Sequence, residues 1–119
     1  MKKIALLMIA KGNSKRLKNK NKLNYNGKPM FVWNIKKGLA VSKNFYFNSD
    51  DEEMIKIASK LKLKIIKREK KLREPETPSR LIFKSCLNKI PKKIDGILHI
   101  QANSPNLDVN LIRCAFKIM

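Results

Sequence analysis

The stretch "IALLMIAKGNSKRLKNKNKL", Ile4–Leu23, joins a run of seven apolar residues to a loop crowded with lysines. The run Ile4–Ala10 has the length of a strand and does not alternate between apolar and polar residues. Continuous apolar runs of this length are typical of strands buried on both faces, as in parallel sheets. The stretch therefore predicts a central strand of an α/β domain, followed by a polar loop at Lys11–Lys28.

Beyond this loop the apolar spacing changes repeatedly between helix and strand. Strands are predicted at 44–48, at 61–67 and in "DGILHIQ" at 95–101. Helices are predicted from four apolar faces: Phe31, Ile35 and Leu39; Met54, Ile55, Ala58 and Leu61; Ile82, Phe83, Cys86, Leu87 and Ile90; and Val109, Ile112, Phe116 and Met119. Because strands and helices alternate, we expect a parallel sheet with helices on both faces.

Acidic residues mark the start of the second helix. Ser49 with Glu52, or Asp50 with Glu53, has the spacing of a capping box. Carboxylates near a helix N-terminus also interact favourably with the helix dipole. We therefore interpret this acidic group as a helix start rather than as a metal site.

The formal net charge of the 119 residues is +19, which favours anionic partners. Lysines are nevertheless spread along the whole chain, as a coding bias towards AT-rich codons would produce, and a nucleic-acid patch should be localised. A nucleic-acid partner is therefore disfavoured. No segment approaches the roughly 20 apolar residues of a membrane span.

Three further side chains are interpreted as structural. Cys86 and Cys114 lie in apolar helical patterns without metal-site or redox spacing, so we expect both to be buried, in a reducing cytoplasm. His99, the only histidine, lies within a predicted strand and is expected in or near the core rather than in catalysis.

Ligands of parallel sheets bind beyond the carboxyl ends of the strands. This rule selects the loops Lys11–Lys28, Arg68–Ser79 and Gln101–Asn106. In the first loop a glycine permits close backbone approach and is surrounded by donors and cations suited to phosphate: Lys11, Gly12, Asn13, Ser14, Lys15, Arg16 and Lys20. Neither the P-loop spacing nor the GxGxxG fingerprint is present.

Five segments in order resemble the cytidylyltransferases that make CMP-activated sugars, with the acylneuraminate (sialic acid) enzymes as close relatives. "AKGNSKRLKNKN" resembles the family's opening A-R-x-x-S-K-R-x-x-x-K-N. "GKPM" resembles G-K-P-L, and "NSDDEEMIKIA" resembles S-T-D-D-E-E-I-A-x-x-A. "REKKLREPETPS" and "IQANSPNL" resemble R-P-x-E-L-A-x-D-x-A-S and L-Q-P-T-S-P-L-R. The resemblance covers nearly the whole chain but only about the first half of a family member.

The resemblance implies a Rossmann-like nucleotidyltransferase fold: an α/β three-layer sandwich with a mostly parallel sheet. Residues 1–119 would then be the N-terminal part of a single domain, incomplete at the C-terminus. It also implies transfer of CMP from CTP to an acidic sugar, with release of pyrophosphate. By the same resemblance, Lys20 stabilises the departing pyrophosphate and Gln101 faces the sugar. CTP is assigned to Lys11, Gly12, Asn13, Ser14, Lys15, Arg16, Asn21, Arg68 and Ser79.

The chain departs from the family pattern at several positions. Lys11 stands where arginine is usual, which replaces a bidentate fork by a point charge. The family also implies Mg²⁺, but its carboxylate ligands and its dimerisation segment lie largely beyond residue 119, so no metal ligand is assigned and a homodimer is expected only with the missing half. A non-catalytic nucleotide-binding remnant and, less favoured, a basic nucleic-acid-binding module stay open as alternatives.

Overall fold

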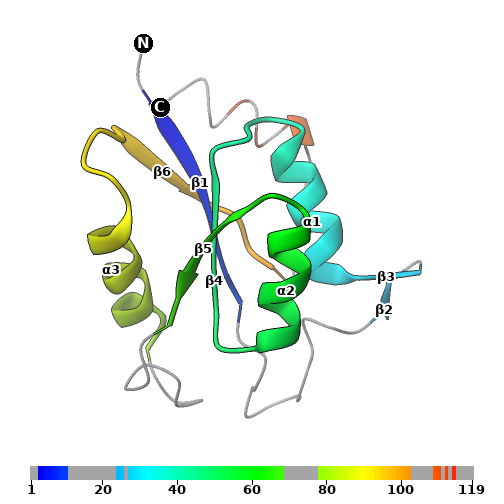
Figure 1. Ribbon diagram of the computed structural model, residues 1–119. Helices are drawn as coiled ribbons and strands as arrows, with labels where there is room; N and C mark the ends of the chain where they lie inside the picture. The colour runs from blue at the N-terminus through cyan, green and yellow to red at the C-terminus, as the bar shows by residue number, and fades with distance from the viewer. Residues whose placement is uncertain are drawn as a thin grey trace.

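The computed structural model describes residues 3–10, 24–25, 27–68, 78–102, 109–110, 112 and 114. The elements in chain order are β1 (Ile4–Ala10), β2 (Asn24–Tyr25), β3 (Lys28–Pro29), α1 (Met30–Leu39), β4 (Phe45–Ser49), α2 (Glu52–Lys60), β5 (Lys64–Lys67), α3 (Ser79–Lys89) and β6 (Gly96–His99) (Figure 1). The backbone at 109–110, 112 and 114 is also helical.

The main sheet has the strand order β5-β4-β1-β6, and each neighbouring pair is parallel. From β1 the chain moves outward through β4 to β5, and then crosses back to place β6 on the other side of β1. Because crossover connections are right-handed, the helices of connections that run in opposite directions along the sheet lie on opposite faces. α1 and α2 therefore cover one face and α3 the other. The predicted α/β fold with a parallel sheet is confirmed.

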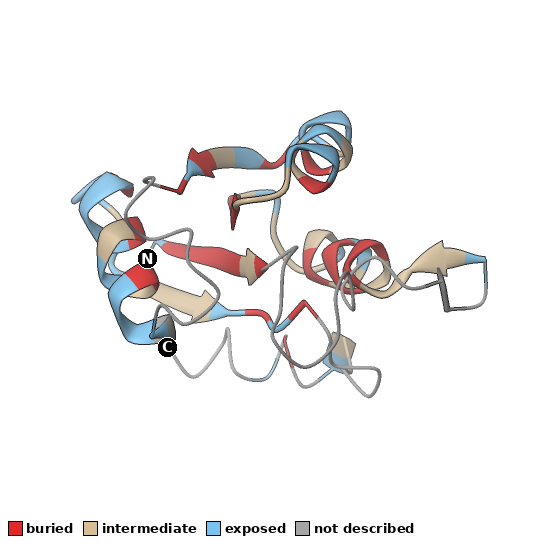
Figure 2. Ribbon diagram, turned by 90° about the horizontal axis from the view of Figure 1, so that it is seen from below, coloured by how far each residue is buried: buried red, intermediate tan, exposed pale blue. Residues whose placement is uncertain are grey.

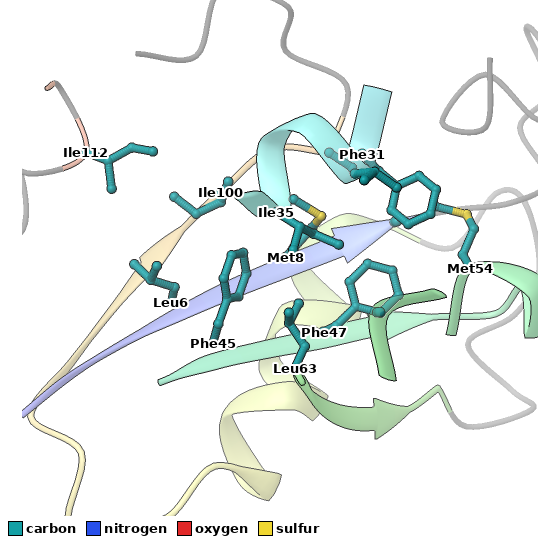
Figure 3. Packing of buried hydrophobic residues seen from close by; sticks show 14 residues of the cluster. Leu6, Met8, Phe31, Ile35, Phe45, Phe47, Met54, Leu63, Ile100 and Ile112 are labelled. Carbon is teal, nitrogen blue, oxygen red and sulfur yellow. The ribbon is translucent and has the colours of Figure 1, made fainter. Parts of the chain in front are cut away.

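Side chains of β1 alternate between two apolar cores, which makes the fold three-layered. Leu6 and Met8 pack with Phe31 and Ile35 of α1 and with residues of α2 (Figure 3). On the opposite face, the second core joins β1 to α3 and contains Ala5, Leu7, Tyr46, Ile66, Ile82, Cys86 and Ile90. Figure 2 shows buried residues in the middle of the sheet and exposed residues on the outer sides of the helices. The uninterrupted apolar run therefore reflects burial on both faces.

The helix α1 lies close to the sheet because of a glycine. A Cβ added at Gly38 would collide with the ring of Phe45, whose Cδ2 and Cζ atoms would lie 3.1 and 3.2 Å away. Both residues are buried. The missing side chain therefore makes room for the aromatic ring at the start of β4.

The start of α2 differs from both predicted capping boxes. Asp51 is the N-cap, and its carboxylate accepts a hydrogen bond of 3.0 Å from the amide of Met54. The hydroxyl of Ser49 instead accepts a bond of 3.1 Å from the amide of Asp51. Asp50 is turned to a different partner, Arg68. The acidic residues do mark a helix start, but the two predicted pairings are wrong because strand β4 extends through Ser49.

Strand boundaries also shift from the predictions. β4 starts at Phe45 rather than at residue 44, and β5 starts at Lys64 rather than at residue 61. Residues 61–62 form a turn after α2, in which Lys62 has a φ of 73°. The apolar residues just after α2 were therefore assigned to β5, because in the sequence they continue the apolar pattern of that strand.

The predicted loop Lys11–Lys28 contains a short antiparallel pair that the sequence analysis missed. Asn24 pairs with Pro29 and Tyr25 with Lys28. Gly27 lies between the two strands with a φ of 87°, which a residue without a side chain adopts readily. Two-residue strands leave no periodic pattern, so only the glycine could have indicated the turn.

The helical faces are confirmed in part. Ile82, Cys86 and Ile90 are buried, whereas Leu87 is 41% exposed because α3 buries a narrower stripe than its apolar residues cover. Of the last predicted helix, Val109 is half-buried and Ile112 buried, while Phe116 and Met119 lie outside the described residues.

Two predictions of burial are wrong. Cys114 is exposed, although Cys86 is buried as expected. His99 is exposed because β6 is an edge strand of the described sheet. In the described segments, no helix is long and apolar enough to cross a bilayer.

Candidate functional site

The carboxyl ends of three strands are level with one another. Ala10 at the end of β1 is the register partner of Ser49 in β4, and Ser49 is the partner of Lys67 in β5. On the other side of β1, β6 ends earlier: His99 pairs with Leu7. The chain turns in opposite directions from β1 to β4 and from β5 to β6, so the crevice between β1 and β6 is the switch point where ligands of such sheets bind.

Arg68 connects the three level strand ends. It follows β5 directly and is only 3% exposed. Its Nε donates to Oδ1 of Asn48 over 2.9 Å, and its Nη2 donates to the carbonyl oxygen of Ala10 over 3.1 Å. Its Nη1 lies 3.6 Å from Oδ2 of Asp50. Asn48 is itself held, since its Nδ2 donates to the carbonyl of Ile66 over 2.9 Å.

Asn34 of α1 holds the chain that leaves β6. Its side chain is fully buried, and its Nδ2 donates to the carbonyl oxygens of Gln101 over 2.9 Å and of Ala102 over 3.2 Å. Gln101 is exposed at this point, while Ala102 is buried. The turn that presents Gln101 at the sheet edge is therefore attached to α1 through its backbone.

The predicted site residues differ in how much of them the structure describes. Arg68 and Gln101 are described and follow strands on opposite sides of β1. Arg68 is a buried side chain rather than a surface one. Ser79 is the first residue of α3, and nothing further is described of it. The remaining predicted residues lie outside the described part of the chain: Lys11, Gly12, Asn13, Ser14, Lys15, Arg16, Lys20 and Asn21.

The sequence analysis missed Asn34 and Asn48. A signal for each was present, because an asparagine inside an apolar helical face or at the end of the strand "FYFNS" must find hydrogen-bond partners when buried. The partners themselves, backbone carbonyls of distant strands, leave no trace in sequence spacing.

Charge at this edge is partly balanced within the protein. The cation of Arg68 faces the carboxylate of Asp50, and the first turn of α2 carries Glu52 and Glu53 after the N-cap Asp51. A triphosphate bound here needs additional positive charge. The lysine-rich segment that follows Ala10 in the sequence is a source of that charge.

The described residues do not form a metal site. Across them, no three His, Cys, Asp or Glu side chains gather so that they could hold a metal ion. Asp50, which lies at the strand ends, is paired with Arg68. The part of the chain that the structure describes therefore does not fit the Mg²⁺ that the resemblance implies.

Two titratable groups near the sheet have pKa values shifted by desolvation, which is extensive for the buried Cys86 and only partial for His99, an exposed residue whose ring is covered on one side. Desolvation raises the pKa of Cys86 to about 11, against the smaller opposing effects of Arg68 and Lys89. Desolvation lowers the pKa of His99, whose ring contacts Phe83 edge-on at 6.0 Å between centroids. Neither group is poised for acid–base chemistry at the carboxyl edge.

A separate hollow of about 520 Å³ lies at the opposite edge of the sheet. Its lining comes from residues that precede or begin the strands: Lys3, Ile4, Lys43, Asn44, Tyr46, Lys64, Pro91, Lys93 and Ile94. It is rich in lysine, but it faces away from the carboxyl ends and from Ala10.

Comparison with known proteins identifies the family. The family model described as cytidylyltransferase matches residues 5–118. The pseudaminic acid cytidylyltransferase of Campylobacter jejuni is 27% identical over 117 residues, which are 93% of this chain and 50% of that protein. The chain thus spans half the length of this curated relative.

Two solved structures share the fold. CMP:2-keto-3-deoxy-manno-octonic acid synthetase, complexed with CTP, matches with a TM-score of 0.80 at 19% identity, over 98% of this chain and 47% of the other. A Mycobacterium tuberculosis protein in complex with manganese matches with a TM-score of 0.74 at 13% identity, over 98% and 59%. At such low identities, the similarity to these two structures shows the fold alone. The match to the family model, in contrast, covers residues 5–118, which is nearly the whole chain. This chain belongs to the cytidylyltransferase family.

Proposed function

We propose that the chain is the N-terminal part of a single nucleotidyltransferase domain that transfers CMP from CTP to an acidic sugar. The sugar hydroxyl attacks the α-phosphorus of CTP, the bond from that phosphorus to the bridging oxygen breaks, and pyrophosphate leaves. The observation that carries the proposal is the position of Ala10 and Gln101, which lead out of β1 and β6 on either side of the switch point.

The proposal assigns the triphosphate to the segment after Ala10. Lys20 offsets the negative charge that develops on the departing pyrophosphate, which is a usual electrostatic contribution in phosphoryl chemistry. The other members of the segment supply backbone amides, side-chain donors and charge: Lys11, Gly12, Asn13, Ser14, Lys15, Arg16 and Asn21. Arg68 and Ser79 are proposed near the nucleotide.

The acidic sugar is proposed to be of the sialic acid type, with Gln101 facing it. The exposed side chain of Gln101, on a turn held by Asn34, supports this position. Pseudaminic acid and 2-keto-3-deoxy-manno-octonic acid, which name the two similar proteins, are both acids. Divalent metal, Mg²⁺ by the resemblance, is proposed to accompany CTP, and no described residue is assigned to it.

Binding of CTP tests the nucleotide site. We expect the chain to bind CTP in titration calorimetry and the variant Lys20→Ala to bind it more weakly. Lys56→Ala, which removes the same charge from an exposed position in α2, is the matched control. Equal affinity of Lys20→Ala and Lys56→Ala for CTP would contradict the assignment.

Turnover separates an enzyme from a non-catalytic remnant. With CTP, Mg²⁺ and an acidic sugar, we expect little or no pyrophosphate from the 119-residue chain alone, because it spans half of its curated relative. The chain completed by the second half of the domain is expected to release pyrophosphate. CTP binding without turnover in that completed protein would favour the remnant.

The lysine-rich hollow at the amino ends of the strands favours a second candidate, a nucleic-acid-binding module. Binding driven by backbone phosphates weakens steeply as salt rises and shows no preference for CTP. Affinity for a DNA duplex that falls in this way, together with no binding of CTP, would favour this second candidate.

A further inference from the structure

The hollow at the amino ends of the strands is separate from the proposed nucleotide site, because it lies at the opposite edge of the sheet. We propose that this hollow is a second anion site, which binds a small soluble molecule carrying two or more phosphate groups. The inference goes beyond the proposed function and does not depend on it, since none of the described residues that line the hollow lies at the carboxyl edge.

Four lysines line the hollow, and each comes from a different part of the chain. Lys3 precedes β1, Lys43 precedes β4, Lys64 begins β5 and Lys93 lies in the connection from α3 to β6. Because these strands are parallel, the segments that lead into them meet at one edge of the sheet (Figure 1). The fold thus gathers positive charge that is dispersed along the sequence, and no carboxylate is among the described lining residues. Gathered charges of one sign attract an anion.

The backbone on both sides of β1 is fixed by hydrogen bonds between segments. The carbonyl oxygen of Lys3 accepts bonds from the amides of Asp95 over 2.7 Å and of Gly96 over 3.3 Å. The amide of Lys3 donates to Oδ2 of Asp95 over 2.6 Å, so this nearby carboxylate is held by the backbone. On the other side of β1, the amide of Leu6 donates to the carbonyl oxygen of Asn44 over 2.8 Å. The segments around the hollow are therefore held at fixed separations, as in a preformed binding site.

Lys64 is held at the wall of the hollow by two contacts. Its Nζ donates to Oδ1 of Asn44 over 3.1 Å and lies 5.1 Å from the centre of the Tyr46 ring. Both partners also line the hollow. The bond to Asn44 uses one of the three N–H donors of an ammonium group. The cation is therefore positioned before a ligand arrives, which lowers the entropic cost of binding.

The size of the hollow favours a small molecule over a nucleic acid. Its volume of about 520 Å³ lies within the range of roughly 300–1,000 Å³ that small-molecule sites occupy. A DNA duplex presents its phosphates along an extended face, which cannot enter such a space. Ile4, Pro91 and Ile94 add apolar lining. The net charge of +19 opposes a second copy of the chain as the occupant, whereas a molecule with two or more phosphates can contact several lysines at once.

A titration with inorganic tripolyphosphate, followed by amide NMR of the full chain, tests the location of the site. At about 0.15 M salt, where distant surface charges are screened, we expect the signals of residues 43–46 and 93–96 to shift and saturate. Inorganic phosphate should bind about tenfold more weakly or worse, because it reaches fewer lysines. Equal affinity for the two anions would overturn the proposed ligand class. Shifts spread evenly over the exposed lysines of α2 would overturn the site itself.

Two double variants separate a site from general attraction. Lys43→Gln with Lys93→Gln removes two charges from the hollow and leaves Lys64, which is bonded within the protein, in place. The matched control is Lys56→Gln with Lys84→Gln, at exposed positions of α2 and α3 that do not line the hollow. We expect the first pair to weaken tripolyphosphate binding at the hollow by about tenfold and the control by less than about twofold. Equal weakening would overturn the proposal in favour of net charge alone.

All four substituted side chains are exposed, so both double variants should fold, and the same spectra check this. Because the signals are resolved by residue, binding of the probe at the proposed nucleotide site is seen separately from binding at the hollow. Failure to bind CTP would therefore overturn the proposed function and leave this result intact. Finally, we expect a short DNA duplex not to displace tripolyphosphate from the hollow. Displacement, with shifts of the same residues 43–46 and 93–96, would overturn the proposal in favour of a nucleic-acid-binding surface.

Discussion

The Nδ2 atom of Asn34 donates a hydrogen bond of 2.9 Å to the carbonyl oxygen of Gln101, which lies 67 residues further along the chain. A second bond of 3.2 Å joins the same atom to the carbonyl of Ala102. These bonds tie the first helix to the segment that leaves β6. The position of Gln101, the candidate sugar-facing residue, thus depends on α1, although nothing in the sequence of α1 indicates this contact.

Replacing Asn34 by alanine should destabilise the fold by about 1–3 kcal/mol, because the carbonyl groups of Gln101 and Ala102 lose their donor. Urea unfolding followed by circular dichroism measures the loss. The control Asn88→Ala removes an exposed asparagine from α3 and should change stability by less than about 0.5 kcal/mol. Equal stability of the two variants would show that the Asn34 bonds contribute nothing net.

Replacing Gly38 by alanine should destabilise the protein by about 1–3 kcal/mol, although alanine is the better helix former. The added Cβ meets the ring of Phe45, which is fully buried. Thermal unfolding of Gly38→Ala, Phe45→Leu and the double variant gives the coupling between the two sites. We expect the smaller side chain to relieve part of the cost. Stabilisation by Gly38→Ala alone would refute the close contact.

The two cysteines should react at very different rates. Cys86 is buried, and its pKa of about 11 leaves only about 1% thiolate at pH 9. Iodoacetamide at pH 8, followed by mass spectrometry, should modify the exposed Cys114 first. In the control Cys114→Ser, labelling should wait for unfolding by urea. Fast labelling of that folded variant would contradict the burial of Cys86.

The same pKa predicts a loss of stability in alkali. Burial raises the pKa of the Cys86 thiol from its ordinary value of 9.0 to about 11. The stability that the neutral thiol contributes is therefore fully present below about pH 9 and is lost as pH rises through about 11. Comparison of the parent chain with Cys86→Ala over this range isolates the contribution, since other groups titrate in both. An identical slope for the two proteins would be the contrary result.

The imidazole of His99 should titrate with a pKa below its usual 6.5, because desolvation disfavours the charged ring. Proton NMR measures this directly, since the chain has one histidine. Phe83→Ala should move the pKa back towards 6.5, whereas Leu87→Ala, at an exposed position of the same helix, should not. The neutral ring of His99 therefore contributes stability above pH 6.5, and this contribution is lost as pH falls through the pKa of the ring in the folded protein. A pKa at or above 6.5 would be inconsistent with this environment.

The segment Ile4–Ala10 shows why the fold was predictable. Its seven residues form β1 as expected, because a strand covered on both faces can carry apolar side chains without interruption. The faces of α1 and of α3 around Ile35 and Ile82 were equally clear, since burial follows the helical period. Burial was misjudged at Cys114, Leu87 and His99, because the sequence does not show which apolar positions of a helix face outward or which strand is at the edge of the sheet.

The sequence by itself determined the parallel α/β class, because the spacing of apolar residues and the alternation of strands and helices are local properties of the chain. Only the tertiary structure decided the partners of Arg68 and Asn34. Ala10 and Arg68 are 58 residues apart and meet because parallel pairing aligns Ala10, Ser49 and Lys67 at one edge. A buried polar side chain must find a partner, but which partner it finds depends on the register between strands, and no spacing along the chain encodes that distance.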